Sequence, residues 1–141
     1  MAKITLDGID DVIRTVTKLG AAADGMVDKM LNAGGLAAKE KLQDVLEGSH
    51  RHILTGSMHD KTGYTDPKSY GSARQVTVYP RGKDKKGTSN ALKGFVLNYG
   101  SPARGIVGDG WFDYGSYAAE PQIESEMRRV FDEEIDEVLN D

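Results

Sequence analysis

The residues of this sequence that could bind a metal lie close together in one polar segment. His50, His52, His59 and Asp60 fall within eleven residues and include a His-x-His pair. Two imidazoles separated by one residue share a face of a β-strand, where they could chelate Zn²⁺ if two further ligands were near. The surrounding residues are mostly polar and small, which predicts a loop without the rigidity of a metal site. We therefore expect solvent-exposed histidines here, with no metal and no other cofactor.

Catalytic patterns are equally weak in this chain. No serine lies in a Gly-x-Ser-x-Gly setting, and no Gly-Lys-Ser/Thr of a phosphate-binding loop occurs. The chain has no cysteine, which excludes disulfides, thiolate nucleophiles and sulfur metal ligands. We therefore expect no enzyme, and a small hydrolase is the weakest of the alternatives.

Charged side chains are spread unevenly along the chain. Residues 61–94 hold eight Lys or Arg and two Asp, a formal charge of +6, whereas residues 120–141 hold nine Asp or Glu and two Arg, a formal charge of −7. A molecule with this charge separation can associate head to tail, with the basic segment of one copy against the acidic end of the next. The alternative is that both segments are ordinary solvated surfaces.

The basic segment also allows a role as a nucleic-acid-associated accessory protein. Lysines of the loop 81–93 could contact phosphates, and the nearby rings of Tyr79 and Phe95 could stack on bases. The formal net charge of the whole chain is −4, and no known nucleic-acid-reading motif is present, which weighs against a dedicated binder. A flexible basic loop that docks on an acidic protein neighbour is the interpretation that we prefer.

Helices with one apolar face must position these segments. From Asp24 to Glu47 apolar residues recur mostly every three or four positions, which predicts one long amphipathic helix. Gly48 suits a left-handed cap at its end, and Gly34-Gly35 in its middle predicts a kink or a close approach of another backbone. A second clear pattern, from Ile123 to Leu139, predicts an amphipathic C-terminal helix.

The shorter elements are less strongly marked. Ala91 to Tyr99 fits a helix capped by Ser89 or Asn90 and ended by Gly100, or a strand, and we favour the helix. The other expected elements are a strand at Lys3 to Leu6, a helix spanning Ile9 to Leu19, one strand from Ala73 to Pro80, a loop at 101–110, a return of Trp111-Phe112 to the core, and a helix beginning near Tyr114 to Ala119 with Ser116 as a cap and Pro121 in its first turn.

Length and composition describe one α+β domain spanning residues 1–141. Charged residues make up 28% and hydrophobic residues 38%, which is ordinary for a globular protein. We expect three main helices packed on a small, mostly antiparallel sheet, with flexible polar loops at 49–71 and 81–90. No apolar run approaches about 20 residues, and Met1 to Asp7 lacks the apolar region of a signal peptide. We therefore expect no membrane segment and a cytoplasmic chain.

Several short motifs occur in a recognisable order. They are Leu6-Asp7-Gly8-Ile9 before the long helix, the turn Leu54-Thr55-Gly56-Ser57-Met58, the strand Val76 to Tyr79, the segment Phe95 to Ser101, and Trp111-Phe112 before the last helix. In this order they resemble the head–tail joining, or neck and tail-completion, proteins of long-tailed bacteriophages and prophages. The chain departs from the family pattern at Asn98, where an acidic residue is usual, and at Met58, where Leu is commoner.

The resemblance implies a structural virion protein and not an enzyme. Copies of such a protein are arranged as a ring around the channel between portal and tail tube. The implied partners are further copies of the chain, a connector or head-completion protein, and a tail terminator or tail-tube protein, with unspecific DNA contact in the channel. The implied location is the neck or tail of the virion, and the host cytoplasm during assembly.

Charge and resemblance together predict the contact residues. One predicted face carries Lys83, Lys85, Lys86 and Arg104, and the other carries Glu133, Glu134 and Glu137. The alternative for all seven is ordinary solvated surface.

Overall fold

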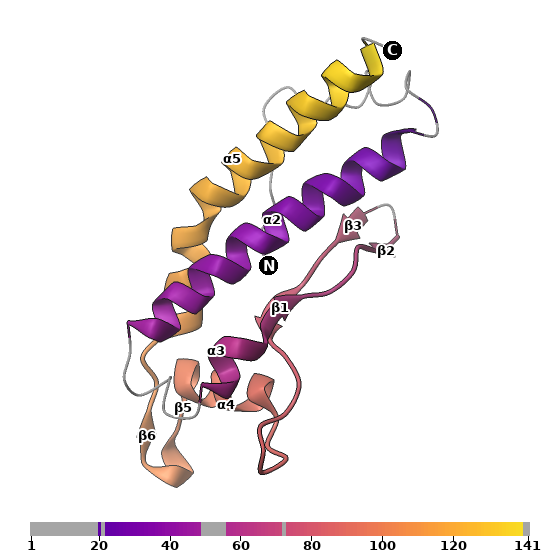
Figure 1. Cartoon of the computed structure of the whole chain (residues 1–141). Helices are drawn as coiled ribbons and strands as arrows, with labels where there is room; N and C mark the ends of the chain where they lie inside the picture. Colours follow the sequence, from indigo (N-terminus) through magenta and orange to yellow (C-terminus); the bar gives the residue numbers. More distant parts are fainter. Residues whose placement is uncertain (1–19, 21, 49–55, 72, 140–141) are drawn as a thin grey trace.

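The structure is a computed structural model that describes residues 20, 22–48, 56–71 and 73–139. Two long helices dominate it: α2 (Ala22–Glu47) and α5 (Trp111–Leu139) lie antiparallel and side by side along most of their length (Figure 1). Both long amphipathic helices predicted from apolar periodicity are therefore confirmed. The predicted strand at Lys3 to Leu6, the helix spanning Ile9 to Leu19, and His50 and His52 lie outside the described residues.

The glycine pair of α2 marks a close approach and not a kink. A Cβ atom on Gly34 would lie 3.1 Å from the Met127 Sδ of α5, and one on Gly35 would lie 2.8 Å from the Tyr64 Cγ. The helix continues unbroken through both residues. The pair therefore makes room for side chains from two other elements, one beside each glycine. The sequence had predicted the close approach of another backbone instead.

The core lies where the end of α2 meets the start of α5. Its fully or nearly fully buried side chains are Leu42, Leu46, Met58 and Trp111. Met58 belongs to the five-residue helix α3 (Ser57–Lys61). Gly56, the residue before this helix, has a left-handed backbone conformation with φ 72°. The Trp111 indole Nε1 donates a hydrogen bond to the Gly94 carbonyl at 3.0 Å. The predicted return of Trp111 to the core is therefore confirmed.

Within the described residues, the strands form three separate antiparallel pairs. These are β1 (Thr62–Tyr64) with β4 (Val78–Pro80), β2 (Lys68–Tyr70) with β3 (Ala73–Gln75), and β5 (Gly100–Ser101) with β6 (Ile106–Val107). With the long helices they give an α+β fold, as predicted.

The prediction of a single strand from Ala73 to Pro80 was wrong. The first part, β3, pairs with β2, whereas the last part, β4, pairs with β1. Between these two pairs, Thr77 and Thr65 are hydrogen-bonded to each other outside the regular strand pairing. The resulting arm extends along α2 in Figure 1. Its outer part is fixed there because the Arg74 guanidinium binds the Asp28 carboxylate through two hydrogen bonds of 2.7 and 2.8 Å.

The segment 49–71 was predicted to be a polar loop, and its described part, 56–71, contains α3, β1 and β2 instead. The polar composition of the segment did not predict these elements, because they are held in place by the contacts of a few single residues. Met58 is buried in the core, and the Thr62 hydroxyl, also buried, donates a hydrogen bond to the Met58 carbonyl at 2.6 Å. The predicted loop at 101–110 likewise contains β6 and a short 3₁₀ helix, η1 (Pro102–Arg104).

Two predicted helix ends were also wrong. Helix α5 begins at Trp111 and continues through Pro121, so neither Tyr114 to Ala119 nor a Ser116 cap starts it. Gly48 follows α2 but does not have a positive φ, and its N–H bonds to the Asp44 carbonyl at 3.1 Å. Among the described helices, none combines the length and the apolar character needed to cross a bilayer.

Candidate interaction surfaces

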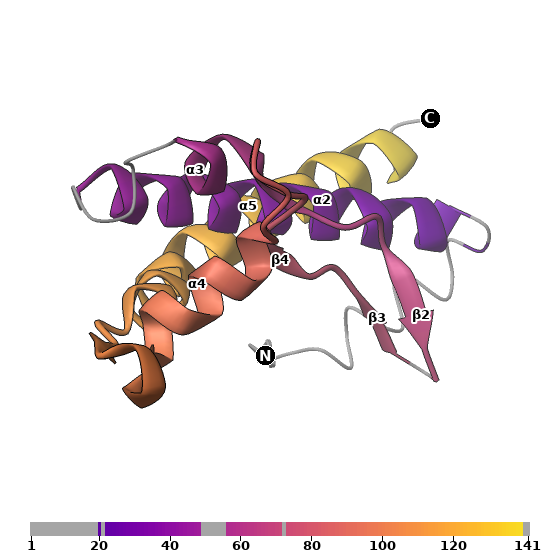
Figure 2. The same cartoon turned by 90° about the horizontal axis from the view of Figure 1, so that it is seen from below.

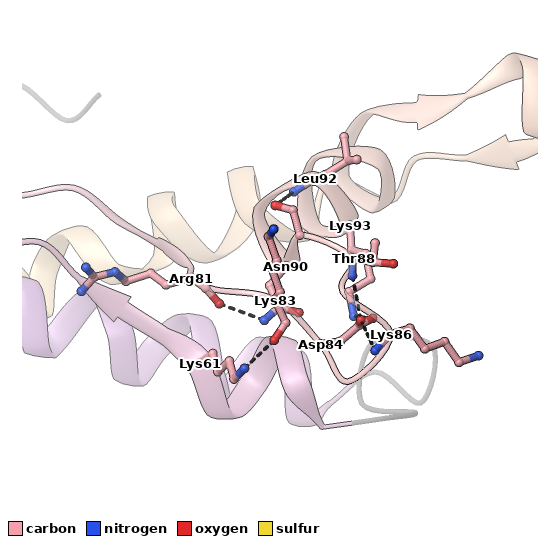
Figure 3. Close-up of polar contacts among 10 residues, drawn as sticks. Lys61, Arg81, Lys83, Asp84, Lys86, Thr88, Asn90, Leu92 and Lys93 are labelled. Carbon is pink, nitrogen blue, oxygen red and sulfur yellow. Dashed lines mark hydrogen bonds and ion pairs between the residues drawn. The ribbon is translucent and has the colours of Figure 1, made fainter.

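The basic residues of the segment 81–89 are held in a compact turn that leads into α4 (Asn90–Tyr99). One Asp84 oxygen accepts hydrogen bonds from the Lys86 and Thr88 backbone N–H groups at 2.9 Å each, and the other binds the Lys93 ammonium at 2.8 Å (Figure 3). The hydrogen bond from Lys93 is the main reason why the pKa of the Asp84 carboxyl falls to about 2. The segment 81–90, predicted to be a flexible loop, is therefore a hydrogen-bonded turn built on one carboxylate.

The structure brings the four predicted basic residues to one end of the molecule. Lys83, Lys85 and Lys86 are exposed on the turn before α4, and the Lys83 carbonyl accepts a hydrogen bond from the Lys61 ammonium. Arg104 is exposed in η1, which lies between β5 and β6 just after α4. In Figure 1 the turn and the β5–β6 hairpin both lie at the lower end, on different sides of α4.

The predicted acidic residues lie at the opposite end, on the last turns of α5. Glu134 bonds to Lys29 of α2 at 2.8 Å, and its side chain is only 17% exposed. Glu133 accepts a hydrogen bond from the Arg129 guanidinium at 2.8 Å, and Glu137 is exposed. Glu134 therefore joins the two long helices of its own chain, which argues against the partner-facing role predicted for it.

Helix α4 buries its polar side and exposes its large apolar residues, although apolar residues of a helix usually face the core. Asn90, Gly94 and Asn98 form its buried face, with exposed fractions of 0% for Asn90 and 5% for Asn98. The large apolar residues Leu92, Phe95 and Tyr99 face outward and are 54%, 59% and 63% exposed. Burial of the apolar face is the usual source of stability for a helix in a globular protein. The reversal in α4 therefore leaves an unusual apolar surface open.

Each of the three buried residues of α4 has a contact that a large apolar side chain could not make. The Asn90 amide donates to the Arg81 carbonyl at 2.8 Å. Gly94 leaves space for Trp111, because a Cβ atom there would lie 3.1 Å from the indole Cζ2. The Asn98 oxygen accepts hydrogen bonds from the first turn of α5. These polar contacts fix the orientation of the helix and thereby turn its apolar side outward.

The outward residues of α4 border a largely apolar groove of about 230 Å³. The Phe95 and Tyr99 rings lie 4.8 Å apart between centroids. The guanidinium carbon of Arg81 lies 5.9 Å from the centroid of the Tyr79 ring. The groove thus has aromatic walls, and its lining residues are Tyr79, Pro80, Ala91, Gly94, Phe95, Asn98, Tyr99, Trp111 and Phe112.

His59, predicted to be a solvated loop histidine, is half-buried between two carboxylates. Its Nε2 lies 2.7 Å from a Glu47 oxygen at the end of α2, and its Nδ1 lies 3.0 Å from an Asp60 oxygen. Hydrogen bonding to Asp60, followed by the bond to Glu47, raises the pKa of the imidazole above its usual value. Within the part of the chain that the structure describes, no three His, Asp or Glu side chains are grouped to hold a metal ion.

Sequence reasoning missed the groove because periodicity identifies a helical face without saying what covers it. One usable signal was present: Asn90, Gly94 and Asn98 recur every four residues and form a second stripe opposite the apolar one. Comparison of the chain with protein-family models, with curated proteins and with solved structures finds no match.

Proposed function

We propose that this chain is a structural virion protein of the neck or tail-completion region of a long-tailed bacteriophage or prophage. In that role it joins the head connector to the tail through contacts with copies of itself and with neighbouring virion proteins. The observation that carries the proposal is the outward apolar face of α4. An exposed aromatic groove is typical of surfaces that bind other proteins.

The separation of charge along the molecule supports the same role. The basic turn and Arg104 lie at one end, and the acidic last turns of α5 lie at the other (Figure 1). Opposite charges at opposite ends favour head-to-tail contacts between copies, as a ring around a channel requires. The connector or head-completion protein and the tail terminator or tail-tube protein are the proposed neighbours above and below such a ring.

A nucleic-acid-associated role has less support from the site. Asp84 already occupies the backbone amides and the Lys93 ammonium that a phosphate would use in the basic turn. The exposed lysines that remain suit unspecific contact with DNA in the channel. We therefore propose only unspecific contacts between these lysines and DNA in the channel.

The test of this function uses the head-completion and tail-tube proteins encoded in the same genome. We expect the purified chain to co-sediment with at least one of them, and the variant with Phe95→Ser and Tyr99→Ser to lose this binding. The Tyr70→Ser variant is a matched control, because Tyr70 is 57% exposed on β2. Binding to neither protein, together with a salt-dependent gel shift of DNA at submicromolar protein, would favour the nucleic-acid role instead.

A further inference from the structure

The outer halves of the two long helices, residues 22–33 of α2 and 121–139 of α5, have an apolar side that is only partly buried. From position 120 to position 138 no residue of α5 is buried, although Phe131 and Ile135 are apolar and four residues apart. In α2, Val27 and Leu31 are partly buried in the same way. At the other end of the same helices, the core side chains are almost completely buried. The outer halves therefore lack a complete cover among the described residues.

The apolar residues of the outer half of α2 lie on its side between α5 and the arm. At about 100° per residue, Val27 and Leu31 lie about 20° and 60° around the helix from Gly34, which adjoins α5. Asp28, which binds Arg74 of the arm, lies about 60° beyond Leu31. Figure 1 shows α5 and the arm on different sides of α2. Val27 and Leu31 are thus directed between these two elements.

The apolar residues of α5 lie on the same side of the helix pair. Around α5, Glu134 lies about 20° before Met127, which adjoins α2, whereas Phe131 and Ile135 lie about 40° and 80° after it. Glu134 binds Lys29 at 2.8 Å, and this ion pair closes the other side of the helix pair. Phe131 and Ile135 therefore face the side away from the ion pair. We call the four apolar residues on this side, Val27, Leu31, Phe131 and Ile135, the apolar strip.

The segment before α2 has the pattern, the ending and the length to cover the apolar strip. Its apolar residues recur at helical spacing, and they are Ile9, Val12, Ile13, Val16 and Leu19. Gly20, which follows them, has φ 60°, the left-handed conformation that commonly ends a helix. Helix α2 begins at Ala22, and helices joined by two residues pack as an antiparallel hairpin. A helix over 9–19 would be about 16 Å long and would reach back to the level of Leu31.

We infer that residues 9–19 form a helix that packs antiparallel to α2 on the apolar strip of its own chain. The two-residue link places Ile13 at the level of Asp28, and the contacts of Gly34 and Lys29 with α5 place Ile135 at that same level. Ile13 therefore meets Ile135, and the charged residues of the segment face the solvent. The inference concerns the fold of one chain and does not rest on the proposed virion role. With the strip covered, the exposed side of α4 remains for binding neighbouring proteins.

Disulfide trapping in the full chain tests this contact directly, because the native chain contains no cysteine. Ile13→Cys with Ile135→Cys places one thiol on each side of the inferred contact. Arg14→Cys with Ile135→Cys is the matched control, because Arg14 lies about 160° around the helix from the centre of the apolar pattern. Both variants are oxidised with diamide in dilute protein. Non-reducing electrophoresis and mass spectrometry of peptides then separate a bond within one chain from a bond between two chains.

We expect the bond within one chain to form at least about tenfold faster in the variant with Ile13→Cys than in its control, because a disulfide needs Cα atoms within about 7 Å. Thermal unfolding of two further variants gives a second measurement that needs no thiols. Ile13→Asp places a charge on the apolar strip and should lower the melting temperature, whereas Arg14→Asp should change it little.

Three results would overturn the inference. The first is an equal rate of bond formation in the two cysteine variants. The second is a bond that forms only between chains, because the strip would then hold the segment of another copy. The third is an equal melting temperature for Ile13→Asp and Arg14→Asp.

Discussion

The side-chain oxygen of Asn98 accepts a hydrogen bond from the Phe112 backbone N–H at 2.9 Å, and a second one from Asp113 at 3.2 Å. Asn98 comes from α4, whereas Phe112 and Asp113 lie in the first turn of α5. The N–H groups of Trp111 and of Gly110 before it bond to an Asp109 side-chain oxygen and to the Asn98 backbone carbonyl. All four amides that a helix start usually leaves unpaired are therefore satisfied. One buried amide side chain both orients α4 and begins the longest helix.

Replacing Asn98 by Ala should therefore destabilise the fold. The change leaves two amides at the start of α5 without their acceptor, and we expect a loss of about 2–4 kcal/mol in the free energy of unfolding. Urea denaturation followed by circular dichroism measures it. Asn32→Ala is the matched control, because Asn32 is exposed on α2 and its replacement should be nearly neutral. A loss of stability at Asn98 no larger than that of the control would contradict the capping role.

The glycine pair of α2 should respond to alanine quite differently from an exposed glycine of the same helix. At Gly35 a Cβ atom would lie 2.8 Å from the Tyr64 Cγ, so we expect Gly35→Ala to destabilise by about 1–3 kcal/mol despite the better helix propensity of Ala. At Gly25 nothing lies within 4 Å, and Gly25→Ala should stabilise by up to about 1 kcal/mol. Thermal unfolding of both variants measures the difference. Equal effects at the two positions would show that Tyr64 does not pack against α2.

The contacts of His59 should make stability depend on pH. The pKa of the imidazole is raised in the folded chain above the ordinary value of 6.5 by hydrogen bonds to Asp60 and Glu47. Such a group contributes stability that is fully present below the unfolded pKa and is lost as the pH rises through the folded pKa. The melting temperature of the native chain minus that of His59→Gln should therefore be largest below about pH 6.5 and should shrink as the pH rises. A difference that stays constant or grows with pH would contradict these contacts.

The outward orientation of α4 can be probed chemically because the chain contains no cysteine. A single thiol introduced by Leu92→Cys should react quickly with a maleimide in dilute protein, since Leu92 is 54% exposed. Leu42→Cys is the buried comparison, with Leu42 only 2% exposed, and should react at a rate limited by unfolding. Slow labelling at both positions would mean that the apolar face of α4 is covered within the monomer.

The sequence predicted the two long helices because apolar residues recur through α2 and α5 over many turns. It also predicted α4 with Ser89 or Asn90 as its cap and with its end at Gly100. Ser89 is the cap, and its hydroxyl accepts a hydrogen bond from the Leu92 N–H at 3.2 Å. These features are local in the chain. They therefore appear in the spacing of residues before any tertiary contact is known.

The features that the sequence did not predict depend on contacts between distant residues. The start of α5 at Trp111 needs Asn98, and the inward polar face of α4 needs Trp111 and Arg81. The break between β3 and β4 is fixed by the partners of those strands. The aromatic groove follows from the same long-range contacts, which apolar spacing alone does not reveal.

The outward face of α4, with the groove bordered by Phe95 and Tyr99, is proposed to bind a neighbouring virion protein. The most direct test is co-sedimentation of the native chain and of the Phe95→Ser/Tyr99→Ser variant with the head-completion and tail-tube proteins encoded in the same genome. We expect the native chain to bind at least one of these proteins and the variant to bind neither. Equal binding by the native chain and the variant, or no binding by the native chain, would contradict the proposal.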